Sequence, residues 1–157
     1  MMRRFPAMPA ARRILSGLAA ATLLIISPAV RADQGEIIKE LSVTNTERIL
    51  EALKIEYSEL KPGIYSFNLG GYKTLLFNKG KNLQFYASFK KKTTMGRIND
   101  WNASKRYTRA YLDKDGDPVL ESDLDLEGGV SYGALAEFFK TWVTSVKLFT
   151  QHIGFQN

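Results

Sequence analysis

The strongest constraint on the fold is an alternation of apolar and polar side chains between residues 64 and 89. Tyr65, Phe67 and Leu69 alternate with polar residues, as in a strand that buries one face. Gly70-Gly71 and Asn78-Lys79-Gly80 interrupt the alternation and are typical of tight turns. Strands joined by such short turns pair antiparallel. The segment therefore predicts three consecutive antiparallel strands.

The third of these strands has two faces of different character. Its apolar face consists of Leu83, Phe85, Ala87 and Phe89, and its other face consists of Gln84, Tyr86 and Ser88. We expect the apolar face to cover the core and the other face to point away from it.

Three segments with apolar residues at helical spacing surround the strands. The first runs from about Thr44 to Lys54, and Thr44 and Glu47 have the spacing of a capping box. The second runs from about Met95 to Lys105, and its Trp101 should anchor it to the core. The third runs from about 131 to 151 and carries the apolar stripe Leu135, Phe138, Phe139, Trp142, Val146 and Phe149.

A second hairpin is expected between the second and third helices. Its strands should lie at Tyr107–Leu112 and Val119–Leu126, on either side of an aspartate-rich turn. The element order becomes α-β-β-β-α-β-β-α, with neighbouring strands in hairpins. This order predicts an α+β fold in which helices pack on an antiparallel sheet.

The first 32 residues differ in composition from the rest of the chain. They contain five arginines and no acidic residue, an apolar run from Ile14 to Ile26, and then Val30-Arg31-Ala32. This order is typical of a secretory signal, so we expect cleavage after Ala32 and a periplasmic or secreted protein. The run has 13 residues, whereas a membrane span takes roughly 20, so no permanent membrane anchor is expected.

The predicted boundaries follow from these segments. Residues 1–32 form the signal peptide, 33–43 a lead-in, 44–151 the α+β domain, and 152–157 a C-terminal tail.

Charge and composition exclude several kinds of site. The chain has 22 Lys and Arg against 16 Asp and Glu, but five of the arginines lie in the leader, which leaves 17 against 16. With so small an excess we expect no nucleic-acid partner. The sequence has no cysteine and a single histidine, His152, which excludes thiolate chemistry and multi-histidine metal sites. No cofactor or metal is expected.

The string Asp113-Lys114-Asp115-Gly116-Asp117 places three carboxylates at alternate positions, as in sites for hard cations. It departs from an EF-hand loop because Gly116 precedes Asp117 and Leu124 stands where the bidentate glutamate should be. We interpret the string as a hairpin turn in which aspartates bond the backbone and Gly116 takes a positive φ. Weak cation binding is the alternative.

Glu121, Asp123 and Asp125 project from one face of their strand, where two carboxylates could act as the acid and base of a glycosidase. Two hairpin registers are open. One places Leu112 opposite Leu120 and hence Arg109 opposite Asp123 and Tyr111 opposite Glu121, and the other places Arg109 opposite Glu121. Either register predicts an exposed ladder of opposite charges, which disfavours general acid catalysis.

A basic cluster of Lys90, Lys91, Lys92 and Arg97 lies around the start of the second helix. It could hold phosphates, but we favour a solvated run at a strand end that discourages edge pairing. His152 has no serine nucleophile motif to pair with, and we expect it to interact with backbone carbonyls.

Three motifs together carry a family resemblance. They are the helix Ile98-Asn99-Asp100-Trp101-Asn102, the hairpin Tyr111-Leu112-Asp113 with Asp115-Gly116-Asp117, and Gly128-Gly129-Val130 before the last helix. Over roughly residues 44–151 the chain resembles the YbjN family, which is described as bacterial sensory transduction regulators. The resemblance implies an α+β fold similar to type III secretion chaperones. It implies no catalytic residues, because the family has no established ones, and the leader is a departure from cytoplasmic members.

We therefore expect a non-enzymatic regulator that binds a protein or peptide partner in the bacterial envelope, with its oligomeric state left open. The candidate partner-binding residues are Tyr86, Tyr107, Tyr111, Asn99 and Asn102. The tyrosines would form an aromatic platform, and the asparagine amides would either cap adjoining strands or contact a partner's backbone. The alternative is a secreted carbohydrate-active hydrolase or binding protein that uses Glu121, Asp123 and Asp125.

Overall fold

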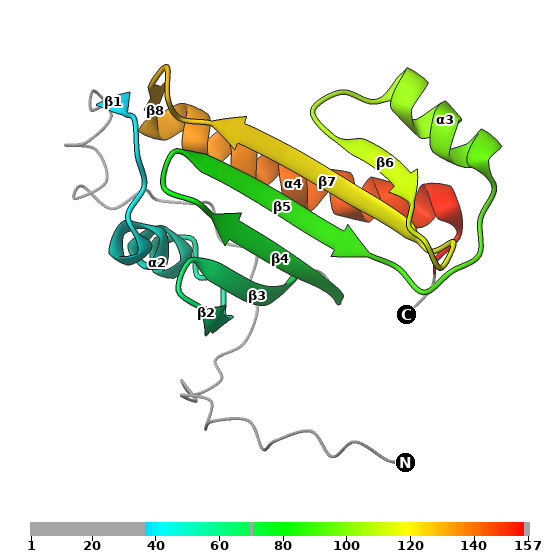
Figure 1. Ribbon diagram of the computed structural model, residues 1–157, viewed down its shortest axis with the longest axis horizontal. Coiled ribbons are helices and arrows are strands. Elements are labelled where there is room, and N and C mark those ends of the chain that lie inside the picture. The colour runs from blue at the N-terminus through cyan, green and yellow to red at the C-terminus, as the bar shows by residue number, and fades with distance from the viewer. Residues whose placement is uncertain (1–36, 70, 156–157) are drawn as a thin grey trace, which may run out of the picture.

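The computed structural model describes residues 37–69 and 71–155 (Figure 1). The expected signal peptide lies outside the described residues. The helices are α2 (Val43–Ala52), α3 (Met95–Ser104) and α4 (Tyr132–Ile153). The strands are β1 (Ile37–Ile38), β2 (Tyr57–Lys61), β3 (Ile64–Leu69), β4 (Tyr72–Asn78), β5 (Asn82–Ser88), β6 (Arg109–Leu112), β7 (Pro118–Asp125) and β8 (Val130–Ser131). Within the described residues, no helix combines the length and the hydropathy of a membrane-spanning segment.

Six of the strands form one antiparallel sheet in the order β2-β3-β4-β5-β7-β6. The other two strands, β1 and β8, form a separate antiparallel pair. In Figure 1, α4 runs along β5 and β7, α2 lies at the β3 end of the sheet, and α3 lies beside the edge strand β6. The predicted α+β class, with helices packed on an antiparallel sheet, is confirmed.

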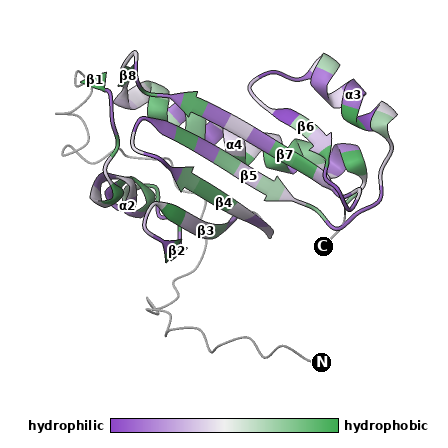
Figure 2. Cartoon of the chain, in the orientation of Figure 1, coloured by the Kyte–Doolittle hydropathy of each residue, from purple (hydrophilic) through white to green (hydrophobic). Residues whose placement is uncertain are grey.

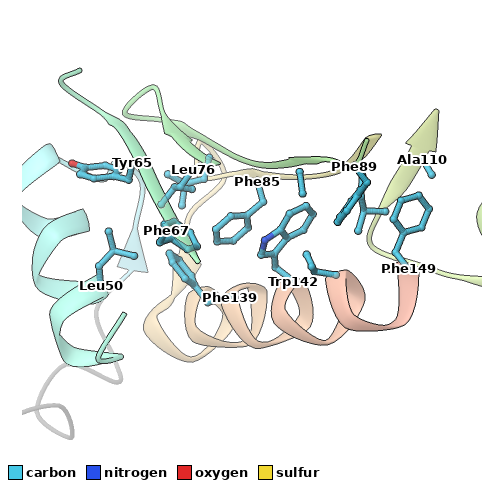
Figure 3. Close-up of a cluster of buried hydrophobic side chains, with 14 of the residues drawn as sticks. Leu50, Tyr65, Phe67, Leu76, Phe85, Phe89, Ala110, Phe139, Trp142 and Phe149 are labelled. Atoms are coloured by element: carbon cyan, nitrogen blue, oxygen red, sulfur yellow. The ribbon is translucent and has the colours of Figure 1, made fainter. Parts of the chain in front are cut away.

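The core lies between the sheet and α4 and is rich in aromatic side chains (Figure 3). Phe85 of β5 stacks on Trp142 of α4 with ring centroids 5.1 Å apart, and Phe139 meets Phe85 edge-on at 4.9 Å. Figure 3 shows that Leu50 of α2 and Tyr65 of β3 extend this layer of buried side chains toward α2. Aromatic pairs in these geometries add to the stabilisation that apolar burial provides.

Trp101 anchors α3, as the sequence predicts. Its side chain is only 1% exposed, and its ring meets Phe149 of α4 edge-on with centroids 5.0 Å apart. Its Nε1 donates a hydrogen bond to Thr108 Oγ1 at 3.2 Å. The indole is therefore both packed and hydrogen-bonded, as a buried tryptophan should be.

The sequence prediction missed β1, β2 and β8. Strand β2 lies at the edge of the sheet and most of its residues are exposed, so its sequence lacks the alternation that identifies a half-buried strand. Strands β1 and β8 have two residues each, which is too short for any periodicity. A turn at Lys61-Pro62-Gly63 joins β2 to β3.

The ends of two helices also differ from the prediction. Ser42 caps α2 and accepts a hydrogen bond from Asn45 N at 3.1 Å, so the capping box expected at Thr44 is wrong. Helix α4 continues to Ile153, beyond the expected end of the domain. Thr94 caps α3, and its Oγ1 accepts a hydrogen bond from Arg97 N at 3.3 Å.

Candidate functional site

One face of the six-stranded sheet has no helix on it within the described residues. Helices α2, α3 and α4 all contribute to one core cluster with inward side chains such as Phe85 and Leu120. Hydrophobic and hydrophilic residues alternate along β5 (Figure 2). We call the side chains that point away from the core the outer face: Ile64, Ser66, Leu75, Phe77, Gln84, Tyr86, Arg109, Tyr111, Val119, Glu121 and Asp123.

Glu121 lies on the outer face between Tyr86 of β5 and Arg109 of β6. Its side chain is buried, and the residue is 6% exposed. Glu121 Oε2 accepts hydrogen bonds from Arg109 Nε at 2.8 Å and from Nη2 at 2.6 Å, and its Oε1 accepts one from the Tyr111 hydroxyl at 2.8 Å. Both carboxylate oxygens are therefore held by side chains of β6.

The ionisation of the two donors favours this arrangement. Burial of Tyr111, together with its hydrogen bond to Glu121, raises the pKa of the tyrosine hydroxyl to about 12. The hydrogen bond and charge of Glu121 raise the pKa of the Arg109 guanidinium. The hydroxyl thus stays a donor and the guanidinium stays charged throughout the physiological pH range.

The observed register is the second of the two alternatives, because Ala110 lies opposite Leu120 and Arg109 opposite Glu121. The first alternative, with Leu112 opposite Leu120, is wrong. The expectation of an exposed charge ladder is also wrong for Glu121, which its neighbours bury.

The other two carboxylates of this strand are exposed and have partners of their own. Asp123 Oδ1 accepts from Gln84 Nε2 at 2.9 Å, and Asp125 Oδ1 accepts from the backbone N of Glu127 at 2.8 Å. Glu121, Asp123 and Asp125 thus share no hydrogen-bond partner, unlike a general acid and base that act on one substrate.

The part of the outer face beside Glu121 is apolar. The rings of Phe77 and Tyr86 meet edge-on with centroids 6.4 Å apart, and Leu75 lies opposite Tyr86. Val119 is 0% exposed although it does not belong to the core cluster. The sequence prediction did not include Leu75 and Phe77, although the two-residue period of a strand places both on the face opposite Leu76.

Asn102 closes the edge of the sheet at β6. Its Nδ2 donates to Ala110 O at 2.9 Å and its Oδ1 accepts from Ala110 N at 2.8 Å. The strand-capping alternative is therefore the one that the structure shows for this amide. Asn99, one turn earlier on α3, is exposed, and a role for it in binding stays a prediction.

Tyr107 does not share a face with Tyr86 and Tyr111. It precedes β6 in a bend, with a left-handed φ of +69°, and its side chain points into solvent with the residue 77% exposed. It lines a groove of about 300 Å³ between α3 and α4 together with Trp101, Lys105, Arg106, Lys140 and Leu148. We call this the α3–α4 groove.

The aspartate-rich string forms the predicted hairpin turn. Asp113 Oδ1 accepts from the backbone N of Asp115 and of Asp117, both at 2.9 Å, and Gly116 has a φ of +77°. Lys92 Nζ donates to Asp115 O at 2.5 Å, which ties the turn to the segment before α3. Among the described residues, no group of three or more His, Cys, Asp or Glu side chains could hold a metal ion.

The basic cluster is partly used inside the fold. Arg97 Nη1 donates to His152 O at 2.8 Å, and His152 Nε2 lies 2.7 Å from Arg97 O, which is a carbonyl of α3 and not one of the free carbonyls at the end of its own helix. This reciprocal pair joins the start of α3 to the end of α4. The preceding strand β5 is central, so the idea that the lysine run protects a sheet edge is wrong.

Comparison with known protein families agrees with the motifs of α3 and of the β6–β7 hairpin. Residues 42–155 match the YbjN family model, which carries the description "Putative bacterial sensory transduction regulator". No curated protein matches the sequence at a significant level.

Proposed function

The chain belongs to the YbjN family, and from this premise we propose that it is a non-enzymatic regulator that binds a polypeptide partner in the bacterial envelope. The family description is that of a regulator of sensory transduction, a role that requires contact with another component. The finer statements, that the partner is a polypeptide and that it is met outside the cytoplasm, are our proposal.

The observation that carries the proposal is the outer face. Leu75, Phe77 and Tyr86 are half-buried there, and Tyr111 is 37% exposed, on a face that no helix covers in the described part of the chain. Aromatic side chains beside an arginine are the residue types that dominate the affinity of protein interfaces. A polypeptide segment is the occupant we propose, because it matches a flat, mixed aromatic and polar surface better than a small ligand does.

The ionic centre supports recognition rather than catalysis. Glu121 is fixed by Arg109 and Tyr111, so these three side chains hold a constant shape and charge for a partner to meet. The same contacts occupy the groups that the alternative hydrolase would need as acid and base. No observation in the described residues favours that alternative.

The proposed location rests on the leader. Its arginines, its apolar run of 13 residues and Val30-Arg31-Ala32 have the order of a cleavable export signal. A partner would then be met in the periplasm or outside the cell.

The proposal is tested by site-specific photocrosslinking in intact cells. A photoreactive phenylalanine at position 86 should capture one defined protein, and capture should fall strongly when Tyr111→Ala is added. The matched control is the same probe at Glu51, an exposed residue of α2. The probe at this position should not capture the protein that position 86 captures. Absence of any specific product from position 86 in a folded, exported protein contradicts the proposal.

A further inference from the structure

We propose that the α3–α4 groove is a docking site for an acidic polypeptide segment. The inference rests on the proposed function, since the segment would belong to the same partner, and it adds the chemistry of what is bound. Three features of the groove carry it: an exposed aromatic on a strained backbone, an excess of positive charge, and a small apolar floor.

The first feature is the way the fold holds Tyr107. Its carbonyl accepts a hydrogen bond from Ser122 Oγ at 2.6 Å, and the next residue, Thr108, accepts one from the Trp101 indole at 3.2 Å. Ser122 and Trp101 are both buried. The Ser122 donor therefore holds the Tyr107 carbonyl, and the Trp101 donor holds the side chain of the next residue, beside a backbone φ of +69° that is unfavourable for tyrosine. Strain of this kind concentrates at functional sites.

Packing of the Tyr107 ring does not account for this left-handed backbone. The residue is 77% exposed and is not part of the core cluster. The fold therefore holds the Tyr107 backbone so that its ring is exposed to solvent at the rim of the α3–α4 groove. Tyrosine is one of the residue types that most often anchor protein interfaces.

The second feature is charge. Lys105, Arg106 and Lys140 line the groove, and the acid Glu137 is held by Lys140 at 2.7 Å. Lys105 Nζ lies 5.9 Å from the centroid of the Trp101 ring. Within the described residues Arg106 has no ion-pair partner, so the groove keeps a net positive charge that a carboxylate can neutralise.

The third feature is the shape and size of the groove. Its volume is about 300 Å³, and Leu148 of α4 is 40% exposed beside it. Such a space accepts a few side chains of one segment. An apolar side chain would contact Tyr107 and Leu148, and flanking carboxylates would reach the cations.

The charge outside the groove argues for a peptide over nucleic acid. The chain after the leader carries 17 Lys and Arg against 16 Asp and Glu, so the groove is a local positive site on a nearly neutral molecule. Nucleic-acid binding depends on many phosphate contacts along an extended basic surface. An acidic peptide needs only a few cations, and Lys105 and Arg106 line the groove without an ion-pair partner among the described residues.

The experiment selects short random peptides for binding to the protein that begins at Asp33. We expect the selected peptides to carry at least two carboxylates beside an apolar residue. Their affinity should fall about tenfold or more in the charge-reversed variant Lys105→Glu/Arg106→Glu, and clearly in Tyr107→Ala. The matched control Lys90→Glu/Lys91→Glu reverses two exposed cations outside the groove and should change the affinity little.

Several outcomes overturn the inference. They are a failure to enrich acidic peptides, equal binding by the groove variants, and tighter groove-dependent binding of a single-stranded oligonucleotide or of anionic phosphatidylglycerol vesicles. Circular dichroism of each variant checks that its fold is intact. If the groove shows no preference for acidic peptides while the probe at position 86 still captures its partner, the docking inference is wrong and the proposed function stands.

Discussion

The side-chain amide of Asn102 pairs with the backbone of Ala110 through two hydrogen bonds of 2.9 and 2.8 Å, so a helix residue takes the place of a neighbouring strand at the β6 edge. An edge strand with free backbone groups is a template for pairing with another chain. The Asn102 amide occupies one donor and one acceptor of that edge, and α3 lies beside it (Figure 1).

Replacement of Asn102 with alanine should therefore have two effects. Loss of both hydrogen bonds leaves the Ala110 backbone without its partner, at a cost of about 1–3 kcal/mol in the free energy of unfolding. The opened edge should also promote self-association that increases with protein concentration. Urea denaturation and light scattering measure the two effects. Asn99→Ala, an exposed asparagine on the same helix, is the control and should change neither.

Replacement of Trp101 with alanine should destabilise the protein by about 3–5 kcal/mol, the usual cost of deleting a large buried aromatic. The matched control is Met95→Ala, because Met95 lies on the same helix and is 55% exposed. Chemical denaturation of the two variants gives the comparison. An unchanged denaturation midpoint for Trp101→Ala would disprove the anchor role.

The pKa of Tyr111 predicts a pH effect at the alkaline end. Because its pKa rises from 10.0 to about 12 on folding, its contribution to stability is complete below about pH 10 and is lost as the pH rises through 12. Tyr65 has a pKa raised to about 12 as well, chiefly by burial, so the loss should be shared. Tyr111→Phe should make the fall in stability over this window shallower, as measured by denaturation at each pH. An equally steep fall in the variant would argue against the raised pKa.

Tyr107 should be dispensable for folding. Glycine adopts a left-handed φ without strain, so Tyr107→Gly should leave the free energy of unfolding unchanged or raise it by up to about 1 kcal/mol. The same variant should bind the acidic peptides of the docking experiment poorly. A large loss of stability would show that the ring has a structural role.

The leader gives a prediction that needs no variant. Mass spectrometry of the exported protein should find an N-terminus at Asp33, because Val30-Arg31-Ala32 has the small residues that a signal peptidase accepts. A full-length chain recovered from the membrane would contradict it.

The sequence predicts the fold well wherever one face of an element is buried. The inward residues Leu83, Phe85, Ala87 and Phe89 of the β5 region are all buried, because burial imposes the alternation that the sequence displays. Strand β2 is not predicted, because it lies at an edge of the sheet where most of its side chains are exposed.

The site is less predictable because it depends on contacts between distant segments. Sequence spacing left two registers open for Arg109, and only the pairing of β6 with β7 selects Glu121 as its partner. The left-handed backbone of Tyr107, which the sequence prediction assigns to a strand, is accompanied by a hydrogen bond from Ser122 on another strand that spacing alone does not reveal. Asn102 was open to two roles for the same reason.

The position of α4 in the chain has a consequence for biosynthesis. This helix covers the aromatic side of β5 with Phe139, Trp142 and Phe149, yet it follows all strands of the sheet in sequence. A nascent chain that has not yet produced residues 132–153 has its strands but lacks the helix that shields Phe85 from water. We therefore expect stable folding to wait until α4 has been synthesised. In the export that we propose, this delay would keep the chain unfolded long enough for a translocation channel, which threads extended polypeptide, to engage it.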